Sequence, residues 1–400
     1  MKIYKIIIGL ILVFMMSGCS KKEVGELYTD KEEVNIIVAT DTHYISENLV
    51  EDGKNIDEIH YNGDGKIVKY VEEITDAFIT DVIKKKPEVL IVSGDLTFNG
   101  AKESHEDFAE KLEKVREAGI EVLVTAGNHD INNYYASKIG KDEIERVDRV
   151  SPKEFKKIYS NFGYSTASYE DRNSLSYITK VTEDLWIFMI DSNIYEENSK
   201  ANPSEAGGEI KEKTLEWIEK HLELAKASGA EVITVTHHNL VDHNSMMNFN
   251  FTINNNEELL KILKKYDVKL NLTGHIHVQD IKEIEHENGV IADISTSALS
   301  VYDNQYGVIK YIPNNEIKYV TEEVDVEGWA RVNNLEDENL LNFEEYSNEF
   351  FRESSRGKAV ESLSGYIVPK EDLKILSEFI GMLNPPYFAG TLDKVYDELI

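Results

Sequence analysis

Five short apolar runs along this chain are each followed directly by residues that bind metal ions, and this repeated order constrains the fold more than any other feature. The runs are rich in Val, Ile and Leu and cover residues 36–39, 89–92, 122–124, 232–235 and 270–272. Because helical stretches separate them, they predict buried strands of an α/β domain. In open α/β sheets the active site lies beyond the carboxyl ends of the strands, so the residues after the five runs are expected to meet there.

The residues that follow the runs combine carboxylates, imidazoles and an amide. In chain order they are Asp41-Thr42-His43, Gly94-Asp95, Gly127-Asn128-His129-Asp130, His237-His238 and Gly274-His275-Ile276-His277. This ligand set suits Mn, Fe, Zn or Co, and the carboxylate of Asp95 could bridge two ions about 3.5 to 4 Å apart. Two divalent ions, two carboxylates and one hydroxide would leave about one positive charge facing the substrate, which favours an anionic phosphate ester.

These motifs resemble the signature of the calcineurin-like metallophosphoesterase superfamily: D-x-H, G-D, G-N-H-[DE], a later His and G-H-x-H. The match extends roughly over residues 34 to 320. The resemblance implies an α/β fold in four layers, with two packed mixed β-sheets flanked by helices. It also implies two metal ions, whose identity among Mn, Fe, Zn and Co the sequence leaves open.

The resemblance implies which residues bind each of the two ions and which residue donates a proton. One ion is assigned Asp41, His43 and His277, the other Asn128, His237 and His275, and both share Asp95. His129 is expected to protonate the leaving oxygen, held in place by Asp130. Family members often have Pro two residues after the liganding His, and His237 is chosen over His238 on that spacing although Asn239 stands there.

Departures from two subfamilies narrow the expected activity. Protein phosphatases carry Arg where this chain has Asn99, and purple acid phosphatases carry a tyrosinate ligand where it has Phe98. The arrangement is similar to bacterial cyclic-nucleotide phosphodiesterases with a helical C-terminal domain. We therefore expect a dinuclear phosphodiesterase that cleaves cyclic nucleotides or other small nucleotide diesters through a metal-activated hydroxide. The alternatives are a phosphomonoesterase, such as a nucleotidase or protein phosphatase, and a non-catalytic metal-binding surface lipoprotein.

Substrate contacts are expected from polar residues beside the motifs, namely Asn99, His238 and His243. The tyrosines of the 131–173 insertion either line the substrate rim or pack the insertion onto the sheet. Asp191, at the end of another apolar run, either orients a metal ligand or caps a turn. The sequence does not decide between these alternatives.

The amino-terminal sequence predicts that the protein is located outside the cytoplasm. Two lysines precede an apolar run that is too short to span a bilayer, so residues 1–18 resemble a secretory signal peptide. Met16-Ser17-Gly18-Cys19 resembles a bacterial lipobox, and Cys19 is the only cysteine of the chain. Acylation of Cys19 would anchor the protein to the bacterial membrane, with residues 19–33 as the lipidated cysteine and tether. The alternative is an ordinary signal peptide with an incidental cysteine.

The rest of the chain predicts a catalytic domain over 34–323 and a small all-α domain over 324–400. Residues 306–312 and 317–322 are expected to form a hairpin that closes the catalytic domain. In the helical domain, apolar residues recur at helical spacing at Leu340, Phe343 and Phe350, and again at Leu373, Leu376 and Ile380. The formal net charge of −31 argues against nucleic acid polymers and anionic lipid surfaces as partners. A small phosphate ester remains compatible, because the metal ions supply the local positive charge.

Overall fold

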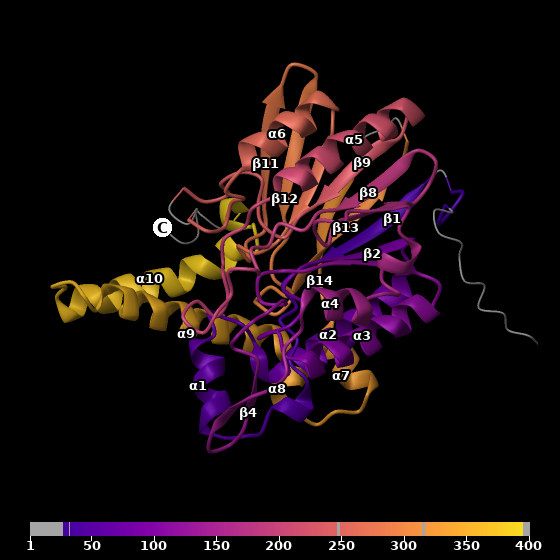
Figure 1. Ribbon diagram of the computed structural model, residues 1–400. Helices are drawn as coiled ribbons and strands as arrows, with labels where there is room; N and C mark the ends of the chain where they lie inside the picture. Colours follow the sequence, from indigo (N-terminus) through magenta and orange to yellow (C-terminus); the bar gives the residue numbers. More distant parts are fainter. Residues whose placement is uncertain (1–26, 32, 246–248, 314–316, 395–400) are drawn as a thin grey trace, which may run out of the picture.

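The computed structural model describes residues 27–31, 33–245, 249–313 and 317–394. They form an α/β fold with two mixed β-sheets flanked by helices, and a helical region at the carboxyl end (Figure 1). The fold class expected from the motifs is therefore confirmed.

The first sheet has the strand order β14-β13-β1-β2-β3. Its parallel strands are β1 (Val34–Ala39), β2 (Val89–Ser93) and β3 (Glu121–Thr125), each close to an apolar run expected to be a strand. The antiparallel hairpin of β13 (Gln305–Tyr311) and β14 (Lys318–Glu323) lies beside β1, as its sequence predicts. The buried side chains of β1, β2 and β3 reflect the continuous apolar runs that encode them.

The second sheet has the strand order β11-β12-β10-β9-β8-β7-β6. Four of its strands are parallel neighbours: β12 (Gly289–Ser295), β10 (Leu270–Thr273), β9 (Glu231–Val235) and β8 (Leu185–Met189). The edges are antiparallel and are formed by β11 (Asp280–His286), β7 (Tyr177–Lys180) and β6 (Tyr169–Glu170).

Buried side chains from both sheets share one large apolar cluster, to which α2 (Val71–Lys85) and α3 (Lys102–Glu117) contribute. A second cluster joins the second sheet to α5 (Glu212–Ser228) and α6 (Asn256–Lys265). The apolar spacing of residues 208–227 predicts a crossover helix with Leu224 on or near its buried face, and α5 corresponds to this helix but begins at Glu212. Leu224, expected near its buried face, is 41% exposed.

Smaller elements fill the long connections between the strands. They are α1 (Lys54–Asn62), α4 (Pro152–Ile158), the hairpin β4 (Ser137–Ile139) and β5 (Ile144–Arg146), and 3-10 turns at Glu47–Leu49, Val68–Tyr70 and Tyr164–Thr166. In the 131–173 insertion, Tyr159 and Tyr164 are 0% and 4% exposed and belong to the main core, whereas Tyr135 is 52% exposed. Packing therefore explains two of the tyrosines.

The carboxyl-terminal region contains α7 (Val326–Val332), α8 (Glu338–Leu341), α9 (Phe343–Leu363) and α10 (Lys370–Phe388). Helices α9 and α10 pair and extend to one side of the sheets, in yellow and gold in Figure 1. The first apolar stripe is buried as expected, since Leu340, Phe343 and Phe350 are at most 7% exposed. In the second stripe, however, Leu376 is 43% exposed. The sequence also predicts a third short helix over 392–399, most of which lies outside the described residues.

The expected signal peptide and Cys19 lie outside the described residues. The end of the expected tether contacts the catalytic domain, because the backbone N–H groups of Tyr28 and Thr29 donate to the carbonyl of Val181, and Lys31 pairs with Glu88. Within the described ranges, no helix combines the length and the apolar character needed to cross a bilayer.

Candidate metal centre

The predicted ligands converge at the edge where the parallel strands of both sheets end. The first sheet delivers Asp41 and His43 after β1, Asp95 after β2 and Asn128 after β3; the second delivers His237 after β9 and His275 and His277 after β10. Backbone hydrogen bonds join these loops, including Asp41 N–H to the Gly94 carbonyl and Gly274 N–H to the His237 carbonyl, both at 3.0 Å. Ligands up to 236 positions apart in the sequence are thereby brought into one site.

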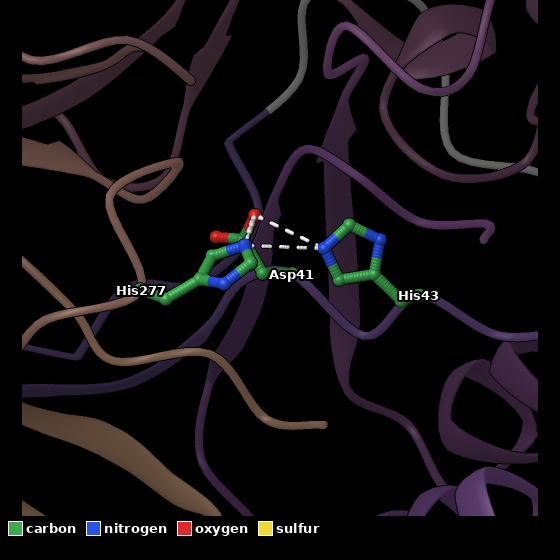
Figure 2. A group of neighbouring side chains, drawn as sticks. All are labelled: Asp41, His43 and His277. Carbon is green, nitrogen blue, oxygen red and sulfur yellow. Dashed lines mark hydrogen bonds and ion pairs between the residues drawn. The ribbon is translucent and has the colours of Figure 1, made fainter. Parts of the chain in front are cut away.

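One cluster consists of Asp41, His43 and His277 (Figure 2). The Nε2 atoms of the two histidines are 3.2 Å apart, and Asp41 Oδ1 lies 3.2 Å from His277 Nε2 and 3.7 Å from His43 Nε2. Asp41 Oδ1 is buried and has no hydrogen-bond donor, whereas Oδ2 accepts from Thr40 Oγ1 and from the N–H of His275. A buried carboxylate oxygen left unsatisfied between two imidazoles is costly alone and fits a metal ion.

Asp95 connects this cluster to the second one. Its Oδ2 lies 3.8 Å from His43 Nε2, and its Oδ1 lies 3.5 Å from His237 Nε2. The backbone N–H of His129 donates to Oδ1 at 2.8 Å and orients the carboxylate. Two oxygens directed toward two groups of imidazoles give Asp95 the geometry of a bridging ligand.

The second cluster joins Asp95 with His237 and His275. The Nδ1–H of His237 donates to the Ser93 carbonyl, which leaves Nε2 facing the site, 3.2 Å from Asn128 Oδ1. His275 has its Nε2 2.9 Å from the Asn250 carbonyl. A hydrogen bond from one ring nitrogen to a carbonyl fixes the tautomer and leaves the other nitrogen for a metal. The donor sets of both clusters therefore fit the two ions that the motifs imply.

Electrostatic interactions within the site are strong because its two carboxylates and most of its imidazoles are buried. Burial raises the pKa of Asp95, but the charges of His129 and His237 outweigh burial and hold that pKa well below its usual range. Burial likewise lowers the pKa of His237, but the carboxylates of Asp95 and Asp41 raise it to about 9. Burial and repulsion from His237 lower the pKa of His275 to about 3. Without metal, His237 is therefore a positively charged imidazolium near neutral pH, whereas His275 is a neutral imidazole.

The backbone at the site adopts conformations that are uncommon for residues with side chains. Asp41, His43, Asp95, His275 and His277 have φ values of 51°, 43°, 47°, 67° and 62°. Positive φ at non-glycine residues is rare and gathers at functional sites, where the surrounding structure compensates the strain. Neighbouring glycines allow the close approach of the loops, since a Cβ at Gly127 would overlap the backbone of Asp95.

His129 faces the site, and its side chain is 32% exposed. Its Nδ1–H donates to the Phe98 carbonyl at 2.7 Å, which directs Nε2 toward Asp95 Oδ2 at 3.8 Å. The expectation that Asp130 holds the ring is wrong. The Asp130 carboxylate instead accepts from the backbone N–H groups of Leu96, Thr97 and Gly127, so it fastens the G-D loop to the G-N-H-D loop. Burial and the charge of Asp95 raise the pKa of Asp130 to about 7.

The three residues expected to contact substrate have protein partners. Asn99 donates to the Ser137 carbonyl and positions β4. His238 is 0% exposed and contacts Ser192 Oγ and the Ala206 carbonyl. The His243 ring lies between the carboxylates of Asp280 and Asp293, at 2.9 and 3.2 Å. Substrate binding by these residues stays a prediction, and in this structure it would require them to leave these partners.

Several supporting groups were not found from the sequence. The carbonyls of Ser93, Phe98 and Asn250 orient ligating or proton-donating imidazoles, and a backbone carbonyl has no sequence signature. Asp191 accepts from Asn193, Tyr195 and the N–H of Leu175, which matches the turn-capping alternative. Ser93 could have been inferred because it precedes the G-D motif directly.

Two proteins of known description are similar to parts of this chain. A probable glycerophosphodiester phosphodiesterase GpdQ from Arcobacter nitrofigilis is 27% identical over 234 residues, which cover 56% of this chain and 70% of that protein. A probable cyclic nucleotide phosphodiesterase from Xenorhabdus bovienii is 24% identical over 208 residues, covering 52% of this chain and 67% of that protein.

The solved structure of a dimetal phosphatase from Danio rerio superposes with a TM-score of 0.52 at 12% identity, covering 73% of this chain and 99% of that one. At this identity the likeness shows the fold alone. Residues 325–400 match the family described as the C-terminal domain of cyclic nucleotide phosphodiesterase. Residues 34–279, more than half of the chain and including every predicted metal ligand, match the calcineurin-like phosphoesterase family, and the chain therefore belongs to that family.

Proposed function

We propose that this protein is a dinuclear metal-dependent phosphodiesterase that cleaves cyclic nucleotides or other small nucleotide diesters. The observation that carries the proposal is the sharing of Asp95 between two clusters, one with His43 and His129 and one with His237 and His275. The carboxyl-terminal region supports a diester substrate, because the family it matches is named for cyclic nucleotide phosphodiesterase. Both similar proteins are also named as phosphodiesterases.

The clusters of the site would hold the two ions. Asp41, His43 and His277 would bind one ion, Asn128, His237 and His275 the other, and Asp95 both. When bound, two such ions supply positive charge that polarises the phosphoryl oxygens and lowers the pKa of an attacking water. Mn, Fe, Zn and Co are all compatible with the mixed imidazole and oxygen donors.

His129 would protonate the leaving oxygen. The Phe98 carbonyl holds the proton on Nδ1, so a second proton on Nε2 points toward the site. Burial lowers the pKa of His129, which makes its imidazolium a stronger acid toward an alkoxide. A ribose hydroxylate is a poor leaving group and therefore depends on this proton.

Charge matching favours diesters over monoesters at the scissile phosphate. A diester has one negative charge on its nonbridging oxygens, which matches the single positive charge counted for two divalent ions, two carboxylates and one hydroxide. A monoester dianion would need a further cation, and the motif position where protein phosphatases have Arg is Asn99, which is bonded to Ser137.

The test compares kcat/KM for a cyclic nucleotide, bis-nitrophenyl phosphate and nitrophenyl phosphate under one metal condition. We expect both diesters to exceed the monoester. A clear preference for nitrophenyl phosphate would favour the phosphomonoesterase alternative and leave the dinuclear site intact. No turnover of any ester by protein that holds two ions would favour the non-catalytic alternative.

We also propose that acylation of Cys19 anchors the protein outside the cytoplasm, an inference supported by the lipobox-like sequence alone. Cys19→Ser should abolish fractionation with membranes and leave hydrolysis unchanged, because Tyr28 already contacts the catalytic domain and only nine positions separate it from Cys19. Equal partitioning of the variant and the wild type would contradict the anchor.

A further inference from the structure

A cleft of about 470 Å³ opens beside His129, on the side of the site formed by α1 and the turn that follows it. Its walls include Phe98, Ile59 and Ile144 as apolar surfaces and Asn62 as a polar group, with Lys66 at the side of α1. Ligand pockets of this kind have volumes of about 300 to 1,000 Å³ and a few polar groups among apolar walls. The cleft adjoins the proton donor, so it lies on the side from which a leaving group would depart.

Lys66 is the distinctive group of this cleft. It is only 7% exposed, although lysine is rarely buried without a partner. Over the parts of the chain that the structure describes, no carboxylate lies within ion-pair distance of its ammonium group. Of the acidic residues of the cleft, Glu58 pairs with Lys54 at 3.1 Å, and Asp64 pairs with Lys358 at 2.9 Å while also interacting with the charge of Lys66 at longer range. The positive charge of Lys66 is also felt at the metal site, where, after burial, it contributes to lowering the pKa of His43.

The segment that carries Lys66 is held by α9 of the carboxyl-terminal region. The ring of His60 stacks on Phe350 with centroids 4.0 Å apart, and His60 Nε2 lies 3.0 Å from the Tyr346 hydroxyl. Gly65 has φ +83° and packs against Phe351, whose ring leaves no space for a Cβ. A fixed cation loses little freedom on binding an anion, so this support favours Lys66 as a recognition group.

On the basis of the proposed diesterase function, we propose that this cleft binds the leaving half of a linear nucleotide diester and that Lys66 binds a phosphate on that half. The matching substrate class is a 5′-phosphorylated linear dinucleotide. The oxygen of water would bond to the scissile phosphorus, and the bond from phosphorus to the 3′ oxygen would break. That oxygen would take its proton from His129, and the water would lose a proton to solvent. The products are two nucleoside 5′-monophosphates.

The experiment compares three substrates with the metal-loaded full chain: a 5′-phosphorylated dinucleotide, the same dinucleotide without its 5′ phosphate, and bis-nitrophenyl phosphate. In the wild type, the 5′ phosphate should raise kcat/KM about 10- to 100-fold, the range of a charge-assisted hydrogen bond. Lys66→Met should bring the ratio of the two dinucleotides close to one, mainly through KM, and Lys66→Arg should keep most of the preference. Lys213→Met is the matched control, because Lys213 is exposed on α5 and does not line the cleft; its ratio should equal that of the wild type.

The outcomes separate this inference from the function on which it rests. Turnover of bis-nitrophenyl phosphate without a preference for the 5′ phosphate would overturn the role of Lys66 and leave the diesterase proposal standing. Failure to hydrolyse any diester would overturn the proposed function itself. A Lys66→Met variant that keeps the wild-type ratio would show that another group reads the phosphate. Equal losses on all three substrates would place Lys66 at the scissile phosphate instead and would also overturn the inference.

Discussion

Binding of the metal ion assigned to Asn128, His237 and His275 should be coupled to the release of one proton from His237. In the metal-free protein, burial lowers the pKa of this imidazole, but Asp95 and Asp41 raise it to about 9. A metal binds only the deprotonated nitrogen, so the ion must displace that proton. The opposite holds for His275, whose pKa burial lowers to about 3, and which is ready to bind at neutral pH.

The pH dependence follows from the difference between the pKa of about 9 and the working pH. At pH 7, two pH units below that pKa, about one molecule in a hundred has a neutral His237. The apparent dissociation constant of the ion should therefore be roughly 100-fold higher than its limit above pH 9, a free-energy difference of roughly 3 kcal/mol. Burial lowers the pKa of His43 well below its usual value and keeps this imidazole neutral. His43 therefore releases no proton when the other ion binds.

Calorimetric titration of metal-free protein with Mn²⁺ under argon, at pH 7 and pH 8 in buffers of different ionisation enthalpy, counts the protons released. One of the two ions should release about one proton from the protein at pH 7 and bind about tenfold more tightly at pH 8. Asp95→Asn should lower the affinity for both ions, because it removes the carboxylate that they share. Release of no proton at pH 7, or affinities independent of pH for both ions, would refute the assignment of a protonated His237.

Two further predictions concern neighbouring groups. His129→Ala should retain two ions but lose about 10²- to 10⁴-fold in kcat for a diester with a ribose leaving group, and much less for a nitrophenyl ester; equal losses on both would contradict a role in proton donation. The pKa of His243, which burial lowers but Asp280 and Asp293 raise to about 9, predicts a stabilisation that is complete below pH 6.5 and lost as pH rises through 9. This amounts to roughly 3 kcal/mol, so urea unfolding at pH 6.5 and 9.5 should show a larger loss of stability in the wild type than in His243→Gln.

The sequence by itself determined the strands and the order in which they deliver ligands. The runs before Asp41, Asp95 and Asn128 are apolar at every position, as strands buried on both faces must be, and each became a strand of the first sheet. Gly127 and Gly274 mark close approaches that a local motif encodes, since a Cβ at either would overlap a neighbouring aspartate. Signals of this kind are local, because chain geometry and ligand chemistry lie within a few consecutive residues.

The tertiary structure alone decided how the ligand loops are supported. Asp130 follows His129 directly, and proximity in the sequence suggested that it holds the ring; the fold instead gives the ring the Phe98 carbonyl and uses Asp130 to join two loops. His243 stands in a polar loop and looked accessible, but β11 and β12 bring Asp280 and Asp293 to both ring nitrogens. Such partners lie far away in the sequence and are chosen by packing.

Lys66 illustrates the same limit for recognition. It belongs to no motif, and its sequence neighbourhood of Gly, Asp and Lys predicts only an exposed turn. Burial of this lysine beside His129 depends on α9, which arrives almost 300 residues later and packs Phe351 against Gly65. Metal ligands could be predicted from the sequence because coordination restricts residue types and spacing. A cleft, in contrast, is formed by side chains from distant segments, which only the folded chain brings together.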